Sequence, residues 1–425
     1  MKHLHPYTIC DIHLENGEEQ LDFLLRQAHY CLFWWKQIPL GQLFTAPGIY
    51  RNTEEFREAV LDSIDPAITF YAVKQGINPG SYRSAFLSGD QWGFAAAMDA
   101  VLGDILYLQL PGTVDVSVII CTRNRADKLQ RCLEMLLNQR RVPGEIIVVD
   151  NAPQDGSTRF VVSGFPTVRY HLEPKPGLDI ARNAGARLAR CPVLAYVDDD
   201  VLVHPDWAYR VWEAFRDPQI DAITGLVIAS ALETESQLLF EKYWSFNRGY
   251  RDRLYDGSFI HRERTGGAPV WEIGAGANMA FRKGVFEKAG YFDERLDVGA
   301  AGCSGDSEMW FRMLSRGMRI LYTPRAVVYH EHRAELRALR KQLFYYMRGF
   351  TAAALIQHGQ DRQAGYVRHF YRVLAPYYLK LLKQGLPSFR GRHRTVFNEI
   401  SGIFSGTLFY LRNRHRPAEA SIDRS

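Results

Sequence analysis

The chain has 425 residues, of which 47% are apolar and 23% are charged, as in an ordinary globular protein. This length predicts two or three domains with a full-sized core. No run of about 18 apolar residues is present, and the start of the chain (1–6) lacks the apolar stretch of a secretory signal. The six cysteines form no Cys-x-x-Cys pair, which favours free thiols in a reducing compartment. We therefore expect a cytoplasmic protein without a membrane span.

The charge is distributed unevenly along the chain. Residues 331–425 carry 17 Lys and Arg against 6 Asp and Glu, a net charge of +11. Residues 1–113 carry 7 against 13, a net charge of −6. A basic end of this kind is information about a binding partner and not about the fold.

Residues 1–113 are predicted to form a separate N-terminal module of unknown role, with a boundary at Pro111-Gly112. The apolar and aromatic stretch Leu21 to Trp35 predicts a buried helix, and a second helix begins near Thr53. The pair Trp34-Trp35 fits either packing in a core or a platform for an acceptor, and packing is the favoured interpretation. We find no catalytic pattern in this module.

A strand–helix–strand unit begins after this module. Val116 to Cys121 and Glu145 to Val149 have the apolar pattern of parallel strands. The helix between them is predicted from apolar residues at helical spacing, namely Leu129, Cys132, Leu133, Leu136 and Leu137. Ligands of such sheets bind outside the carboxyl ends of the strands, where Thr122 and Asp150 lie.

Another apolar strand, Val193 to Val197, ends in Asp198, Asp199 and Asp200. Three adjacent carboxylates repel one another unless a positive charge lies between them. A divalent metal that carries phosphates is one explanation, and a solvated acidic turn is the other.

Two glycine-rich segments and one aromatic segment complete the candidates. Arg182, in the segment 177–185, is either beside a nucleotide or on an ordinary helix surface. Asp306 follows the glycine-rich residues 302–305, which let the backbone come close to a ligand, and the alternative interpretation of Asp306 is a helix N-cap. Residues 230–265, rich in aromatic residues and arginine, form either a lid or a solvated connection. A Gly-x-Gly-x-x-Gly motif after the first strand and a Walker loop are both absent, which weakens a dehydrogenase interpretation.

The order of these motifs resembles that of family 2 glycosyltransferases, which have the GT-A fold. The motifs are Thr122-Arg123-Asn124-Arg125, Asp150-Asn151, Gly177-Leu178 with Ala181-Arg182-Asn183, Asp198-Asp199-Asp200, Gly276 with Asn278-Met279-Ala280-Phe281-Arg282, Gly305-Asp306 with Glu308, and His330 with His332. The resemblance covers roughly residues 114–333. It implies an α/β fold with a GT-A Rossmann-like central sheet and flanking helices, preceded by the N-terminal module and followed by a mostly helical C-terminal region.

The resemblance also implies roles for single residues. Asp306 matches the catalytic base. The nucleotide would contact Thr122, Arg123, Asn124, Asp150, Arg182 and, at the ribose, Asp198. The metal, Mn²⁺ or Mg²⁺, would be held by Asp200 with His330 or His332. The donor and acceptor pocket would include Asp199, Gly276, Asn278 and Glu308. Gly305 departs from the family, which commonly has Glu at that position.

These residues suit one chemistry. A divalent cation stabilises the negative charge that develops on a departing diphosphate, and a single carboxylate removes the proton of the attacking hydroxyl. Direct displacement then inverts the anomeric centre. We therefore expect a metal-dependent inverting transferase. Its expected donor is a nucleotide-diphosphate sugar with uridine as the nucleoside (UDP-linked), and its expected acceptor is a glycan or a lipid-linked sugar. The alternatives are a nucleotidyltransferase that forms sugar nucleotides, and a non-catalytic nucleotide-sugar-binding protein.

Residues 334–425 predict basic amphipathic helices. One apolar stripe consists of Leu336, Leu339, Leu343, Tyr346 and Met347, and another of Leu374, Tyr377, Tyr378, Leu381 and Leu382. Basic helices with aromatic residues suit an anionic membrane surface, which predicts a peripheral protein on the inner face of the cell membrane. The alternative is a helical subdomain packed on the catalytic domain. Nucleic acid is not an expected partner, because no nucleic-acid motif accompanies the charge.

Overall fold

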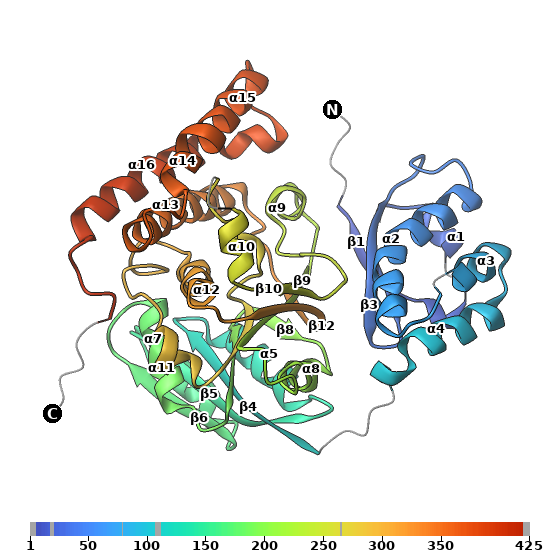
Figure 1. The fold of residues 1–425 in the computed structure, drawn as a ribbon, viewed down its shortest axis with the longest axis horizontal. Helices are drawn as coiled ribbons and strands as arrows, with labels where there is room; N and C mark the ends of the chain where they lie inside the picture. Colours follow the sequence, from blue (N-terminus) through green and yellow to red (C-terminus); the bar gives the residue numbers. More distant parts are fainter. Residues whose placement is uncertain (1–5, 18–20, 79, 107–111, 264–265, 420–425) are drawn as a thin grey trace.

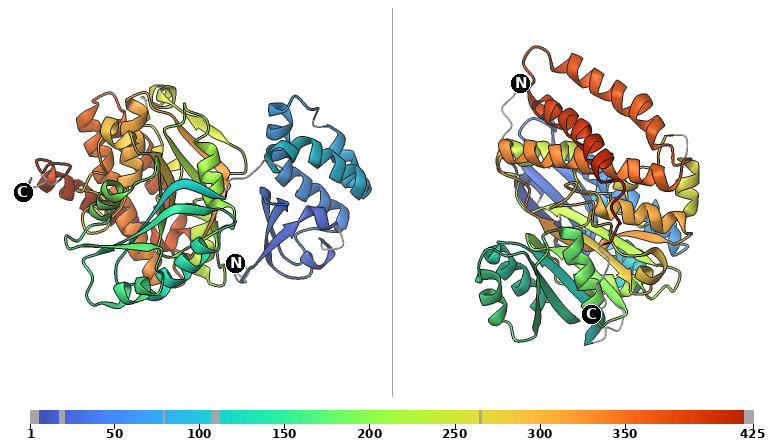
Figure 2. Two further views of the ribbon diagram at one scale, coloured as in Figure 1. Left: turned by 90° about the horizontal axis from the view of Figure 1, so that it is seen from below. Right: turned by 90° about the vertical axis from the view of Figure 1, so that its left-hand side faces the viewer.

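The computed structural model describes residues 6–17, 21–78, 80–106, 112–263 and 266–419. Two sheets organise this part of the chain: a small one near the N-terminus and a large one in the middle (Figure 1). The boundary predicted at Pro111-Gly112 falls partly on residues 107–111, which lie outside the described residues. The C-terminal helices lie on the side of the large sheet away from the N-terminal module (Figure 2).

The large sheet has the strand order β10-β12-β9-β11-β7-β4-β5-β6, and β8 pairs with β12. Four neighbouring strands, β7, β4, β5 and β6, are parallel, whereas β11 runs antiparallel to both of its neighbours. The bounds of the strands are β4 Thr113–Thr122, β5 Val142–Asn151, β6 Val168–Glu173, β7 Val193–Asp198, β8 Val201–Val203, β9 Ala222–Ala229, β10 Arg253–Tyr255, β11 Asn278–Arg282 and β12 Ile320–His330.

Helices cover both faces of this sheet, so alternate residues of β4 face different cores. Val118 and Ile120 pack in a cluster with helices α5 and α8, whereas Ile119 packs with α7, α11 and α12. Strands buried on both faces are expected to be apolar throughout, as β4 is. The bounds of the helices are α5 Ala126–Leu137, α6 Ser157–Ser163, α7 Leu178–Leu188, α8 Trp207–Ala214, α9 Glu235–Trp244, α10 Gly257–Arg262, α11 Val285–Ala289 and α12 Gly305–Ser315.

The N-terminal module consists of the small sheet and the helices packed on it. Its strands are β1 Thr8–His13, β2 His29–Trp35 and β3 Ile38–Thr45, and its helices are α1 Leu21–Leu24, α2 Thr53–Lys74, α3 Gly80–Ser88 and α4 Gln91–Leu106. The predicted helix from Leu21 to Trp35 is wrong beyond α1, because residues 29–35 form the central strand of this sheet.

The reason for this error is that β2 is buried on both faces. All seven of its residues are buried. Phe33 and Trp35 face the helices of the module, whereas Tyr30, Leu32 and Trp34 face the large sheet near β9. A short apolar run of this kind has the same pattern as a buried helix. Trp34 and Trp35 are 2% and 1% exposed, so both are core residues, as favoured from the sequence.

The C-terminal region is helical, with α13 Leu336–Gln360, α14 Tyr366–His369, α15 Ala375–Gly385 and α16 Val396–Asn413. The first predicted stripe faces inward: Leu339 and Leu343 pack against Leu239 and Phe240 of α9. Of the described helices, none combines the length and apolarity needed to cross a membrane. The predicted architecture, an α/β sheet with flanking helices, an N-terminal module and a helical C-terminal region, is confirmed.

Candidate functional site

Three predicted site residues lie side by side at the carboxyl edge of the parallel strands. Thr122 pairs with Asp150 in the register of β4 and β5, and Cys121 pairs with Asp198 in that of β4 and β7. These residues come from separate strands and meet because parallel strands end at the same edge. Thr122 and Asp150 are buried, and Tyr170 donates a 2.8 Å hydrogen bond to Asp150.

The three residues of the acidic triplet have different partners. Asp198, Asp200 and His330 form a group whose potential ligand atoms all lie within 4.8 Å of one another. His330 reaches this group because it ends β12, where it pairs with Val201 just after the triplet. Asp199 is not in this group of three: it accepts hydrogen bonds from Thr122 at 2.7 Å and from Arg125 at 2.9 Å.

The charges in the group favour a bound cation. Burial, with Asp200 adding to it, raises the pKa of Asp198 to about 7. Burial also acts on Asp200, but the nearby His330 and Arg125 lower its pKa overall. Burial lowers the pKa of His330 to about 4, so its ring is neutral near pH 7. Two carboxylates that repel each other beside a neutral imidazole are a donor set that fits a divalent metal ion.

Asp306 lies in the first turn of α12, beside a buried arginine. One of its oxygens accepts a 2.8 Å hydrogen bond from the Gly276 amide, and the other accepts one of 2.6 Å from the Ser307 amide. Ser304 occupies the N-cap position, so the N-cap interpretation of Asp306 is wrong. Burial and the carboxylate of Asp297 raise the pKa of Asp306, although the positive charge of Arg182 opposes them.

Arg182 is 5% exposed, which excludes the ordinary surface arginine. Its guanidinium pairs with Asp179 at 3.0 Å and with Asp297. A Cβ atom added at Gly276 would lie 2.8 Å from the guanidinium of Arg182 and 3.1 Å from the carboxylate of Asp306. Arg182, Gly276 and Asp306 are therefore packed together, as the sequence motifs require if they share one site.

Gly305 leaves room for a carboxylate from another helix. A Cβ atom added at Gly305 would lie 2.1 Å from Oδ2 of Asp179 on α7. This oxygen is buried and has no hydrogen-bond partner among the described residues. Burial and Asp297 raise the pKa of Asp179 well above its usual value. The position at which the family commonly has a Glu side chain is thus next to the carboxylate of Asp179.

The remaining predicted residues have other contacts. Asn278 uses its side chain in the core, where it accepts from Trp207 and donates to the carbonyls of Leu226 and Ala326. Glu308 pairs with Arg312 at 2.7 Å. Their predicted roles in the donor and acceptor pocket stay predictions.

In the nucleotide loop, Asn124 has the left-handed backbone angle φ of 56° and accepts a hydrogen bond from the Gln154 amide. Arg123 is exposed. His332 lies behind His330, and its two ring nitrogens contact His330 at 3.2 Å and Glu241 at 2.9 Å.

Several charged residues of the site were not assigned a role from the sequence. Arg125 contacts both Asp199 and Asp200, and Arg333 lies 3.9 Å from Asp200. Arg125 is part of the Thr-Arg-Asn-Arg motif, so the motif contains a signal for it. No sequence motif marks Asp297 or Glu241, because their contacts with Arg182 and His332 are formed only in the tertiary fold.

Comparisons with known proteins agree with the sequence motifs. Residues 117–290 match the model of a family described as glycosyl transferase family 2. The predicted resemblance to this family is confirmed. The matched segment includes Thr122 and Asp150 at the ends of β4 and β5, the acidic triplet and the Asn278 motif. Asp306 and His330 lie beyond it.

Curated relatives are glycosyltransferases of low identity. A pre-mycofactocin glycosyltransferase of Mycobacterium tuberculosis is 27% identical over 257 residues, which are 60% of this chain and 50% of that protein. The glycosyltransferase AglE of Haloferax volcanii is 26% identical over 234 residues, covering 53% of this chain and 70% of AglE. The aligned part of the chain thus spans only half the length of the first of these relatives.

Among solved structures, a mannosyltransferase of Pyrobaculum calidifontis, in complex with GDP-Man and Mn²⁺, aligns with a TM-score of 0.45 and 16% identity. The alignment covers 83% of this chain and 99% of that one.

The contact between Gly305 and Asp179 predicts a steric limit beside Asp306. We expect Gly305→Ala to lower the free energy of unfolding by about 1–3 kcal/mol, because the added methyl group meets a buried carboxylate in a packed region. Chemical denaturation of the purified variant measures this change. In an Asp179→Ala background the same substitution should cost less, since the obstructing carboxylate is gone.

Gly284→Ala is the matched control. A Cβ atom there meets nothing within 4 Å, and the backbone φ of −64° suits alanine. Equal losses of stability in Gly305→Ala and Gly284→Ala would contradict the steric limit.

Proposed function

We propose that the chain transfers a sugar from a nucleotide-diphosphate sugar to a hydroxyl group, with inversion at the anomeric carbon. The observation that supports this most is the convergence of two chemical groups at one sheet edge. One is the group of Asp198, Asp200 and His330, which fits a divalent cation. The other is the half-buried carboxylate of Asp306, which the charge of Arg182 links to Asp198.

The cation would be held by Asp200 and His330, with Asp198 as the third ligand. The grouping of the three residues favours this role for Asp198 over the ribose contact that the resemblance implies. The imidazole favours Mn²⁺ over Mg²⁺, which prefers ligands that are all oxygen. When bound, the cation supplies Lewis-acid stabilisation to the departing diphosphate.

The nucleotide base would bind at Thr122 and Asp150. Oδ1 of Asp150 has no hydrogen-bond partner among the described residues. A carboxylate oxygen accepts hydrogen bonds, and uracil offers an N–H donor at N3. This pairing supports a UDP-linked donor, with Arg123 and Asn124 shaping the loop at the end of β4.

Asp306 would act as the general base. Its raised pKa makes it a better proton acceptor than an ordinary carboxylate, while it remains ionised above that pKa. Its hydrogen bonds to the amides of Gly276 and Ser307 fix its orientation. The carboxylate would take the proton of the acceptor hydroxyl as the new bond to the anomeric carbon forms and the bond to the diphosphate breaks.

The acceptor would be a glycan or a lipid-linked sugar, as in polysaccharide biosynthesis. One relative, from Haloferax volcanii, is named a glucosyl-dolichyl phosphate glucuronosyltransferase and is 25% identical over 239 residues. We also propose three functional regions, with boundaries at 113/114 and 333/334: the N-terminal module, the GT-A domain and the basic helical region.

The helical region would bind an anionic membrane surface through its outer face. The stripes predicted from the sequence are partly used in packing, since Tyr378 and Leu381 are buried. Glycines 402 and 406 of α16 pack directly on the backbone of α13.

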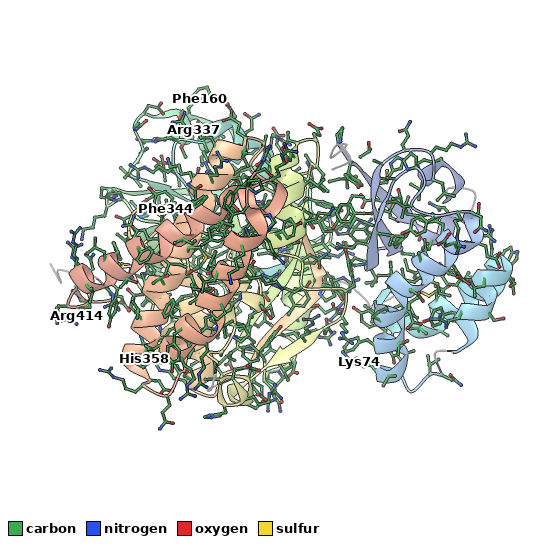
Figure 3. The ribbon with its side chains drawn as sticks, turned by 90° about the horizontal axis from the view of Figure 1, so that it is seen from above. Lys74, Phe160, Arg337, Phe344, His358 and Arg414 are labelled. Carbon is green, nitrogen blue, oxygen red and sulfur yellow. The ribbon has the colours of Figure 1, made fainter. Side chains whose placement is uncertain are left out.

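Other apolar residues of this region are exposed: Val367, Tyr371, Val373, Tyr377, Leu379, Leu386, Phe397, Phe404, Leu408 and Leu411. Figure 3 shows these helices from above, with Arg414 just beyond the end of α16. Exposed apolar residues among arginines and lysines fit anionic lipid.

A panel of nucleotide sugars, incubated with the full chain and Mn²⁺ or Mg²⁺, tests the reaction class. Release of nucleoside diphosphate from one donor, increased by membrane lipid extracts that contain acceptors, is the expected result. Consumption of a nucleoside triphosphate with a sugar phosphate would instead favour the nucleotidyltransferase. Binding of a donor without any turnover would favour the non-catalytic protein.

Asp306→Asn should reduce transfer by about 10²–10⁴-fold, because it removes the proton acceptor. Binding of the nucleoside diphosphate, measured by calorimetry, should be unchanged. Transfer at a rate near that of the unmodified chain would show that another group is the base.

Phe404→Ser combined with Leu408→Ser should weaken flotation of the full chain with vesicles that contain phosphatidylserine, because it removes apolar surface from the outer face of α16. Phe404 is 72% exposed. Phe160→Ser is the matched control, since Phe160 is 80% exposed on α6, outside this region. Equal flotation of all three proteins would rule out this face as the contact with lipid.

A further inference from the structure

The N-terminal module is docked on the catalytic domain through one face of β2. Tyr30, Leu32 and Trp34 pack with residues of β9 and with Val327 of β12. The ring of Trp34 also stacks on His204, with centroids 5.4 Å apart. The apolar face of β2 is therefore buried against the large sheet, which stabilises the contact between the N-terminal module and the catalytic domain. The module thus places polar side chains of its own inside the catalytic domain.

One of these side chains, Tyr30, contacts Glu241 of α9. The Tyr30 hydroxyl lies 3.2 Å from Oε1 of Glu241, and both residues are buried. The hydroxyl also donates to Oε1 of Gln42 on β3, which accepts from Asn247 at 2.7 Å and from Tyr250 at 2.8 Å as well. A carbonyl oxygen has two lone pairs, so three donors compete for it. Glu241 is the second acceptor within reach of the Tyr30 hydroxyl.

A chain of side-chain contacts leads from Glu241 through two histidines to the candidate metal group. Its Oε2 lies 2.9 Å from Nε2 of His332. Nδ1 of His332 lies 3.2 Å from Nδ1 of His330, and Nε2 of His330 lies 3.8 Å from Asp200. Phe246 packs edge-on against both rings, and Phe240 packs against His332. These aromatic rings enclose the chain of contacts, which favours direct bonds between the side chains.

The hydrogen bonds limit which nitrogen of each histidine carries a proton. A carboxylate oxygen only accepts, so Nε2 of His332 donates to Glu241. In the arrangement with one proton on His332, its Nδ1 is an acceptor and Nδ1 of His330 donates to it. Nε2 of His330 is left with its lone pair, and this is the atom nearest Asp200. A metal ligand needs this arrangement, in which the second ring nitrogen is held by an outer partner.

We propose that Tyr30 is a positioning residue for the metal group, acting through Glu241, His332 and His330. The N-terminal module thereby contributes to the catalytic domain an element that orients a metal ligand. This inference rests on the proposed function, because it concerns the cation that the transferase would use.

The test measures Mn²⁺ binding to the full chain by calorimetry, without donor or acceptor. Outer partners of metal ligands typically change affinity by about 10–100-fold, so we expect Glu241→Gln to weaken binding by at least about tenfold. Tyr30→Phe removes one hydrogen bond, worth about 1 kcal/mol, and should weaken binding by about fivefold. Pulsed electron paramagnetic resonance of bound Mn²⁺ should show nitrogen coupling in the unmodified chain and a reduced or altered coupling in both variants.

Tyr378→Phe is the matched control. Tyr378 is another buried tyrosine that donates to a buried carboxylate, Glu399 at 2.9 Å, but it lies in the C-terminal helices. It should leave both the Mn²⁺ affinity and the nitrogen coupling unchanged. If Tyr378→Phe weakens binding as much as Tyr30→Phe, the effect is general destabilisation and the proposal is overturned.

Two further outcomes separate this inference from the proposed function. Unchanged Mn²⁺ affinity in Tyr30→Phe, in an unmodified chain that binds Mn²⁺, would overturn the positioning role and leave the proposed function standing. Transferase activity without any binding or requirement for a divalent cation would overturn the positioning role together with the proposed metal dependence, but not the sugar transfer.

Discussion

The structure depends on the concentration of carboxylates at one edge of the parallel strands. Asp198, Asp199 and Asp200 end or follow β7, and Asp179, Asp297 and Asp306 surround Arg182 close by. Buried carboxylates raise one another's pKa unless cations or hydrogen bonds compensate. The arginines at positions 125 and 182 supply part of this compensation. The remaining negative charge is what would attract the proposed cation to this edge.

The fold brings the groups around these carboxylates from distant parts of the sequence. Arg125 comes from the first strand–helix loop, Arg182 from α7, and His330 from the end of β12. Arg182 and His330 are held by secondary structure whose own stability comes from apolar packing on the two faces of the large sheet, and Arg125 directly precedes α5. Rigid strands and helices are better supports for closely spaced charges than loops are, because repulsion between the charges displaces a loop more easily.

The sequence predicted three neighbouring parallel strands of the large sheet and the candidate residues at their carboxyl ends. The spacing of Leu129, Leu133 and Leu136 predicts α5, and the apolar runs before Asp150 and Asp198 predict β5 and β7. It failed at β2, since burial on both faces removes the alternation that identifies a strand. It also missed Glu241, because its contact with His332 spans 91 positions and leaves no local pattern. Motif order placed Asp200 and His330 in one site, but only the fold shows that Asp198 is near both.

The docked face of β2 has a consequence for how the protein is made. During synthesis the N-terminal module emerges from the ribosome before β9 and β12, which supply the apolar partners of Tyr30, Leu32 and Trp34 in the large sheet. For about 200 residues of elongation this apolar face is open to water or to other chains, a state that favours aggregation. The module and the catalytic domain therefore form a folding unit that is completed only when residue 327 has been added.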